Sequence, residues 1–245
     1  MSGVMIVTGG GRGIGAATAR LAAARGYAVC INYRKDRAAA EQLAKDLGGS
    51  AIAVSADVAD EADVMRLFET VDRELGAVTA LVNNAGIVDL ATRVEAITAA
   101  RLQRMFAVNV FGSFLCAREA VKRMSRSRGG RGGTIVNVSS IAAKLGGPGE
   151  YVDYAAAKGA IDTFTIGLAK EVGPDGIRVN AVRPGIIRTE IHRSSGDPGR
   201  LERIGAAAPL GRPGEAEEVA RVIVWLASDD ASYMSGALVD VSGGR

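Results

Sequence analysis

The chain has 245 residues, of which 30 are Lys or Arg and 27 are Asp or Glu, giving a formal net charge of +3. This near balance argues against nucleic-acid binding, and no apolar run reaches the roughly 18 residues that cross a bilayer. The chain enters an apolar strand pattern almost at once, without a basic leader or cleavage site. We therefore expect a cytoplasmic protein with no nucleic-acid or membrane partner.

Metal and disulfide chemistry have little support in the sequence. His192 is the single histidine, and no cluster of His, Cys and carboxylates has the spacing of metal ligands. We expect no metal site. Cys30 and Cys116 stand in separate apolar contexts, which predicts two buried free thiols rather than a disulfide.

Short apolar runs alternate with longer helical patterns along the whole chain. The expected strands are Val4–Thr8, Ala28–Asn32, Ala51–Ser55, Ala80–Asn83, Thr134–Ser139, Arg178–Val182 and Leu238–Val241. The expected helices are Ile14–Arg25, Arg37–Leu47, Glu61–Leu75, Ala99–Arg123, Tyr151–Val172 and Glu215–Ala227. This alternation predicts an α/β fold, with a doubly wound seven-stranded parallel sheet of Rossmann type between two helical layers.

No Pro/Gly/Ser linker divides the chain, so we expect one domain over residues 1–245. One irregular stretch, around residues 190–214, holds three prolines and several charged residues. A segment of this length within a domain is usually functional, and we interpret it as a lid over a substrate pocket. A poorly ordered connector is the alternative.

A glycine-rich stretch, Thr8–Gly15, follows the first expected strand and opens the first expected helix. Glycines there let the backbone approach a pyrophosphate, and the helix N-terminus presents free N–H groups to it. The strand before it and the helix after it are the context that the dinucleotide motif requires. We expect a dinucleotide to bind here, and a plain tight turn is the alternative.

The end of the second strand indicates which dinucleotide binds. A carboxylate at this place would bind the ribose 2′-hydroxyl of NAD, but the strand ends in Asn32-Tyr33 and Arg34 follows. Arg34 and Arg12 could both bind a 2′-phosphate, which favours NADP(H). Asp36 is close enough in sequence to leave NAD(H) as the alternative.

Tyr154 and Lys158 stand four residues apart in an expected helix, which places them on one face about 5–6 Å apart at Cβ. A cation this close to a phenol favours the phenolate. We expect Lys158 to lower the pKa of Tyr154 from near 10 toward neutrality, where a general acid or base works best. Such a pair also arises by chance on helices, so its meaning depends on the other motifs.

Together these motifs resemble the short-chain dehydrogenase/reductase family, one-domain type, from end to end. The resemblance rests on the glycine loop, Asn83-Asn84-Ala85-Gly86, Asn109, Ser139-Ser140, Tyr154 with Lys158, Arg183-Pro184-Gly185 and Thr189. The segment from Lys144 to Tyr154 is similar to bacterial members labelled glucose 1-dehydrogenase-like or SDR family oxidoreductase.

The resemblance implies a role for each matching residue. Tyr154 would transfer the proton, Lys158 would lower its pKa and bind the nicotinamide ribose, and Ser140 would bind the substrate carbonyl. Asn109 would hold a proton-relay water near Lys158. The residues implied to bind cofactor, besides Tyr154 and Lys158, are Gly9, Arg12, Gly13, Ile14, Arg34, Asp57, Val58, Asn83, Ala85, Gly86, Pro184, Gly185, Ile187 and Thr189.

Two of the catalytic assignments have an alternative residue close by in the sequence. Tyr151 has Ala155 four residues on, so the lysine pairs only with Tyr154. Ser139 and Ser140 are adjacent and would point to opposite faces of a strand. The family spacing favours Ser140, and Ser139 stays an alternative.

The expected function is hydride transfer between NADP(H) and a small carbonyl or alcohol substrate. A 3-oxoacyl-acyl-carrier-protein reductase is a second interpretation, and a non-catalytic NADPH-binding sensor is a third. The last expected strand resembles one that commonly lies at a subunit interface in the family, which implies a homotetramer.

Overall fold

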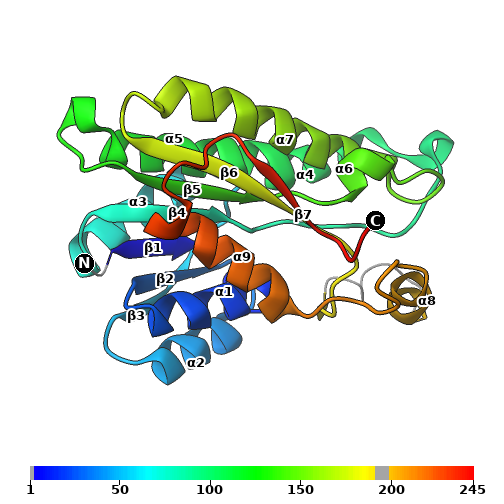
Figure 1. The fold of residues 1–245 in the computed structure, drawn as a ribbon, viewed down its shortest axis with the longest axis horizontal. Coiled ribbons are helices and arrows are strands. Elements are labelled where there is room, and N and C mark those ends of the chain that lie inside the picture. The colour runs from blue at the N-terminus through cyan, green and yellow to red at the C-terminus, as the bar shows by residue number, and fades with distance from the viewer. Residues whose placement is uncertain (1–2, 191–198) are drawn as a thin grey trace.

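Seven strands form one sheet in the order β3-β2-β1-β4-β5-β6-β7, and every neighbouring pair is parallel (Figure 1). The computed structural model describes residues 3–190 and 199–245, and the sheet lies within them. The strands are β1 (Val4–Val7), β2 (Ala28–Tyr33), β3 (Ala51–Ser55), β4 (Val78–Asn83), β5 (Gly133–Val138), β6 (Ile177–Pro184) and β7 (Leu238–Val241). The predicted Rossmann-type fold is confirmed.

Helices cover both faces of the sheet and make three layers, as Figure 1 shows. One layer holds α1 (Gly13–Ala24), α2 (Arg37–Leu47) and α9 (Ala216–Ala227). The other holds α3 (Glu61–Glu74), α5 (Gly112–Met124) and α7 (Val152–Val172). Because both faces are covered, the central strands must be apolar on both sides, and all four residues of β1 are buried.

The long helix expected over Ala99–Arg123 is interrupted. Its first part is α4 (Ala99–Phe106), and a π-helical segment, η2 (Ala107–Phe111), joins it to α5. A π segment adds a residue to the turn and so rotates the side chains that follow it. Asn109 lies within this segment, and its orientation therefore depends on a local irregularity that hydrophobic periodicity does not reveal.

Several short elements were not expected from the sequence. They are α6 (Ala142–Leu145), α8 (Arg200–Ala206) and the 3₁₀ turns η1 (Val94–Ala96), η3 (Arg126–Arg128) and η5 (Asp229–Ala231). The expected buried free thiols are confirmed, since Cys30 and Cys116 are both free and buried.

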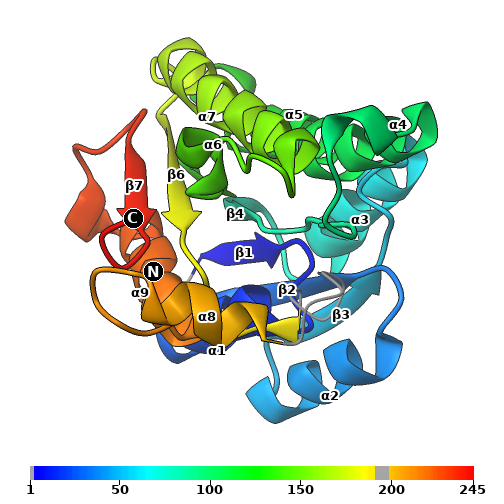
Figure 2. The same cartoon turned by 90° about the vertical axis from the view of Figure 1, so that its right-hand side faces the viewer.

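The expected lid is described in part. Residues 191–198 lie outside the described residues, and with them His192. A bridge between Ile187 and Gly214 closes the base of this segment, and Arg188 N–H donates to the Gly214 carbonyl at 2.8 Å. Figure 2 shows α8 beside the carboxyl-terminal end of the chain, where the Leu210 N–H donates to the Gly243 carbonyl.

Candidate active site

A cavity of about 730 Å³ opens where the chain follows the carboxyl ends of the strands. The strand order reverses between the neighbouring strands β1 and β4, and this is the switch point at which open α/β sheets bind ligands. Most of the residues expected in the site line this cavity: Gly9, Arg12, Gly13, Ile14, Arg34, Asp57, Val58, Ala85, Gly86, Ser140, Tyr154, Lys158, Pro184, Gly185, Ile187 and Thr189.

The glycine loop is held from behind by side-chain amides. Asn32 accepts a hydrogen bond from the Gly9 N–H at 3.2 Å, and Asn84 donates to the carbonyls of Thr8 and Gly9 at 2.9 and 3.0 Å. Gly9 has φ of +60°, and a Cβ there would lie 3.0 Å from Cα of Ala85. This position therefore requires glycine.

The start of α1 is open to a ligand. Arg12 is the N-cap residue and makes no side-chain capping hydrogen bond, so its side chain leaves the first N–H groups of the helix available to a ligand. A Cβ on Gly15 would lie 2.5 Å from the Gly9 carbonyl oxygen, which shows how tightly the loop turns. These donors and this backbone geometry fit the pyrophosphate of a dinucleotide.

Cations surround the end of β2, and one of them is paired. Nε of Arg34 lies 2.7 Å from Oδ2 of Asp57, and Arg12 and Lys35 also line this part of the cavity. The Asp36 carboxylate accepts from the Ala39 N–H at 3.1 Å and caps α2. Asp36 therefore stabilises the start of α2, although it also lines the cavity.

Tyr154 and Lys158 extend from α7 into the cavity, but their electrostatic relation differs from the expected one. Lys158 Nζ lies 5.7 Å from the centre of the Tyr154 ring and donates to the Val138 carbonyl at 2.8 Å. Burial lowers the pKa of Lys158 to about 8, and Asp162 opposes this shift. Burial also raises the pKa of Tyr154, and Ser140 and Arg200, rather than Lys158, act to lower it.

The two adjacent serines have different partners. The Ser139 hydroxyl is buried and donates to the Lys158 carbonyl at 3.2 Å, within the α7 packing. The Ser140 hydroxyl is partly exposed in the cavity, accepts from the Ala142 N–H at 3.1 Å and is a hydrogen-bonding partner of Tyr154. This geometry favours Ser140 as the residue that contacts substrate.

Asn109 is buried behind the cavity wall and does not line it. Its Oδ1 accepts from the Ile87 N–H at 3.2 Å, and its Nδ2 donates to the Ile87 carbonyl at 3.0 Å. A Cβ on Gly86 would lie 2.8 Å from this Oδ1 and 3.6 Å from Lys158 Nζ. Asn109 therefore shapes the segment beside Lys158.

Asn83 is placed away from the cofactor side of the cavity. Its Nδ2 donates to Oδ1 of Asn137 at 2.9 Å and to the Ser113 carbonyl at 3.2 Å. It does not line the cavity, whereas its neighbour Asn84 does. β4 turns the Asn83 amide into the core, where it is held by Asn137 and Ser113.

The sequence did not indicate the residues at the far end of the cavity. Glu150, Tyr151 and Arg200 meet there, and Arg200 comes from α8, fifty residues beyond Glu150. Tyr151 has no lysine four residues on and is not the expected catalytic acid, but it lines the pocket. No local periodicity could have paired these residues, because only the tertiary structure brings α8 to the start of α7.

The chain is similar to known proteins along almost its whole length. A family model described as Enoyl-(Acyl carrier protein) reductase matches residues 9–245. The chain is 54% identical over 245 residues to the uncharacterized oxidoreductase YgfF of Escherichia coli. The match covers 99% of each of the two sequences.

Two solved structures resemble it closely. One is a Serratia marcescens short-chain dehydrogenase/reductase mutant, with a TM-score of 0.90 and 33% identity over 99% of this chain and 97% of that chain. The other is a 3-ketoacyl-(acyl-carrier-protein) reductase from Brucella melitensis complexed with NADH. Its TM-score is 0.93 at 33% identity, over 99% of this chain and 98% of that chain.

Proposed function

This chain belongs to the short-chain dehydrogenase/reductase family of NAD(P)-dependent oxidoreductases, and we propose that it uses NADP(H) to interconvert a small carbonyl and its alcohol. The observation that carries the proposal is the cavity itself, which runs from the glycine loop to Ser140 and Tyr154. When bound, the nicotinamide would supply or accept the hydride.

Residues of the chain itself would transfer the proton and stabilise the negative charge that develops on the carbonyl oxygen. Ser140 would donate a hydrogen bond to the carbonyl oxygen, and Tyr154 would give that oxygen its proton in reduction. Lys158 is buried beside them and would bind the nicotinamide ribose. In the cofactor-free protein its amine is held by the Val138 carbonyl at 2.8 Å.

The preference for NADP(H) is supported by the charges at the end of β2. Arg12, Arg34 and Lys35 line the cavity there, and guanidiniums bind phosphate through paired N–H groups. Asp36 caps α2, which makes it a poor partner for a ribose hydroxyl. NAD(H) stays the alternative cofactor.

A panel of carbonyl substrates with NADPH and NADH, followed at the nicotinamide absorbance, tests this function. We expect turnover with NADPH and a large loss of kcat in Tyr154→Phe. Tight NADPH binding with no turnover of any substrate would instead identify a cofactor-binding sensor. A higher kcat/KM with NADH than with NADPH would contradict the cofactor assignment.

Reduction of a 3-oxoacyl group carried on acyl-carrier protein is a second candidate. It is supported by the resemblance to the Brucella melitensis reductase. The same panel should therefore include acetoacetyl-acyl-carrier protein beside the free thioester. A strong preference for the carrier-bound form would favour this candidate.

We also propose self-association as a homotetramer. Apolar side chains are exposed on neighbouring helices, namely Phe111 at the end of η2, Phe114 on α5 and Ile166 on α7. Phe114 stacks on Phe164 at 3.7 Å between ring centres, which makes this surface continuous. Sedimentation equilibrium would test it, and a monomer would contradict it. No helix in residues 3–190 and 199–245 is long and apolar enough to cross a membrane.

A further inference from the structure

A partly exposed ion pair lies at the far end of the cavity. Arg200 Nη2 lies 2.7 Å from Oε2 of Glu150, and the Arg200 side chain is only 16% exposed. The same guanidinium lies over the Tyr151 ring, with Cζ 4.8 Å from the ring centre. The ring sets the plane of the guanidinium and leaves its edge for in-plane hydrogen bonds.

Part of this guanidinium lacks a partner. Arg200 Nε is buried and makes no hydrogen bond among the described residues. Leaving a buried charged donor unsatisfied is costly, so proteins rarely keep one without a use. Because Arg200 lines the cavity, a ligand that carries an acceptor could supply the missing bond.

The Arg200 guanidinium acts electrostatically on the catalytic Tyr154. Its charge contributes to lowering the pKa of Tyr154, and Tyr151 beneath it is three residues before Tyr154. A substrate whose carbonyl oxygen lies at Ser140 and Tyr154 would therefore have its remaining atoms near Arg200.

The charge of this half of the cavity also favours an anion. Arg104 of α4 and Arg203 of α8 line the cavity together with Arg200. Among the described acidic residues that line the cavity, Glu150 is the one beside Arg200. Glu190 lies beside the glycine loop, where its Oε2 would be 3.8 Å from a Cβ on Gly13, and the remaining acids, Asp36 and Asp57, follow β2 and β3.

We propose that Arg200 is the binding site for a substrate carboxylate, so that the enzyme acts on oxo acids and the matching hydroxy acids. This rests on the proposed oxidoreductase function. A carboxylate fits because it accepts two parallel N–H bonds from the edge of a guanidinium, including the unpartnered Nε. Glu150 occupies part of that edge in the free protein and would be displaced.

The reaction balances without another reactant. In reduction, the hydride with its two electrons goes to the carbonyl carbon, and the Tyr154 proton goes to the oxygen. The reduced nicotinamide is oxidised, and the substrate carboxylate is unchanged.

Matched acids and esters test the proposal. Pyruvate, acetoacetate and levulinate place the carboxylate at three distances from the carbonyl, and each has a neutral methyl ester. We expect the wild type to show a higher kcat/KM with NADPH for the acid than for the ester at one length at least. In Arg200→Ala this acid-to-ester ratio should fall about tenfold to a hundredfold, since charge-assisted hydrogen bonds are lost.

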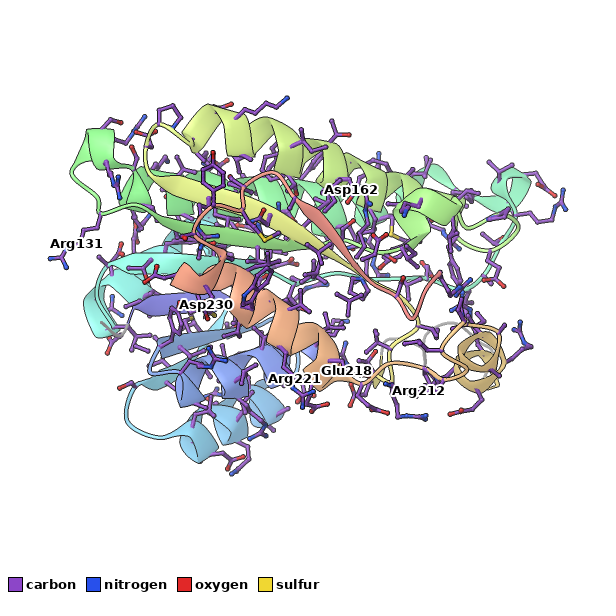
Figure 3. The ribbon with its side chains drawn as sticks, in the orientation of Figure 1. Arg131, Asp162, Arg212, Glu218, Arg221 and Asp230 are labelled. Carbon is purple, nitrogen blue, oxygen red and sulfur yellow. The ribbon has the colours of Figure 1, made fainter. Side chains whose placement is uncertain are left out.

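Three further variants separate charge, geometry and folding. Arg200→Lys keeps the positive charge but loses the two parallel N–H donors of the guanidinium. Its acid-to-ester ratio should therefore lie between those of the wild type and Arg200→Ala. Glu150→Gln removes the negative charge that competes for Arg200 and should raise the ratio. Arg212→Ala is the matched control, because Arg212 pairs with Glu218 at 2.8 Å outside the cavity (Figure 3).

A binding measurement separates this proposal from the proposed function. The same acids are titrated calorimetrically into protein saturated with NADP⁺, in which no hydride can be transferred to them. If an acid binds in this titration in a way that depends on Arg200, but neither the acids nor the esters turn over with NADPH, the carboxylate site is upheld and the reductase is refuted. Turnover of the esters at or above that of the acids at all three lengths, or an acid preference unchanged in Arg200→Ala, would overturn the carboxylate site alone.

Discussion

Nε of Arg34 lies 2.7 Å from Oδ2 of Asp57, so the cation expected to bind the 2′-phosphate is paired with an acid in the cofactor-free protein. Arg34 follows β2 and Asp57 follows β3, two neighbouring strands. Half of the Arg34 side chain is exposed, and such a pair is weak in water. A bound phosphate could therefore replace the carboxylate.

Arg34→Ala should reduce kcat/KM for NADPH about tenfold to a hundredfold, because a charge-assisted contact to the phosphate is lost. The value for NADH should change little, and the ratio of the two is the measurement. Asp57→Asn should raise the NADPH-to-NADH ratio, since it frees the guanidinium. An unchanged ratio in Arg34→Ala would remove the structural basis for the NADP(H) preference.

The adjacent serines should respond differently to the same substitution. Ser140→Ala should reduce kcat by about a hundredfold to a thousandfold, the effect of losing one oxyanion donor. Ser139→Ala should instead reduce stability by about 1 kcal/mol, because a buried hydroxyl bond to the Lys158 carbonyl is lost. Steady-state kinetics and urea denaturation of both variants would decide, and the reverse pattern would make Ser139 the catalytic serine.

Lys158 should make the stability of the cofactor-free protein depend on pH. Burial lowers its pKa from 10.5 to about 8, so between these values the unfolded chain binds more protons than the folded protein. Stability should therefore rise as the pH goes from about 8 toward 10.5. Measuring Tm against pH for the wild type and Lys158→Met isolates the effect. A wild type that gains nothing over Lys158→Met across this window would contradict the lowered pKa.

Asp162 should hold that pKa up. It lies one turn beyond Lys158 on α7, where Figure 3 labels it, and Arg183 binds it at 2.9 Å. The Asp162 carboxylate therefore lies between two cations, Arg183 and Lys158. Arg183 also contacts Asp240 at 3.4 Å. In Asp162→Asn the rise in stability should begin below pH 8, because the carboxylate that favours the Lys158 ammonium is gone. An onset at the same pH as in the wild type would mean that Asp162 has only a structural role.

Asn109 should matter to folding as well as to activity. Both of its amide atoms bind the Ile87 backbone, and its side chain is completely buried. Asn109→Ala leaves the Ile87 N–H and carbonyl without these partners, which should cost about 1–3 kcal/mol of the free energy of unfolding. Urea denaturation measures this loss, and a variant as stable as the wild type would show that Ile87 finds other partners.

The strand pattern and most helices were predictable because they depend on local order. Apolar runs of β-branched residues made the parallel strands recognisable, and the end of β2 before Arg34 was placed to within one residue. The π segment at Asn109 was not predictable, because one extra residue in a turn leaves the apolar periodicity of the flanking helices intact.

What the sequence determined by itself was the family, the fold and the presence of Tyr154 four residues before Lys158. These follow from spacing along the chain, which covalent geometry converts directly into local structure. Only the tertiary structure decided that burial governs the pKa of both residues, and that Glu150 and Arg200 meet. Electrostatics and burial depend on which distant segments pack together, and no local pattern records that.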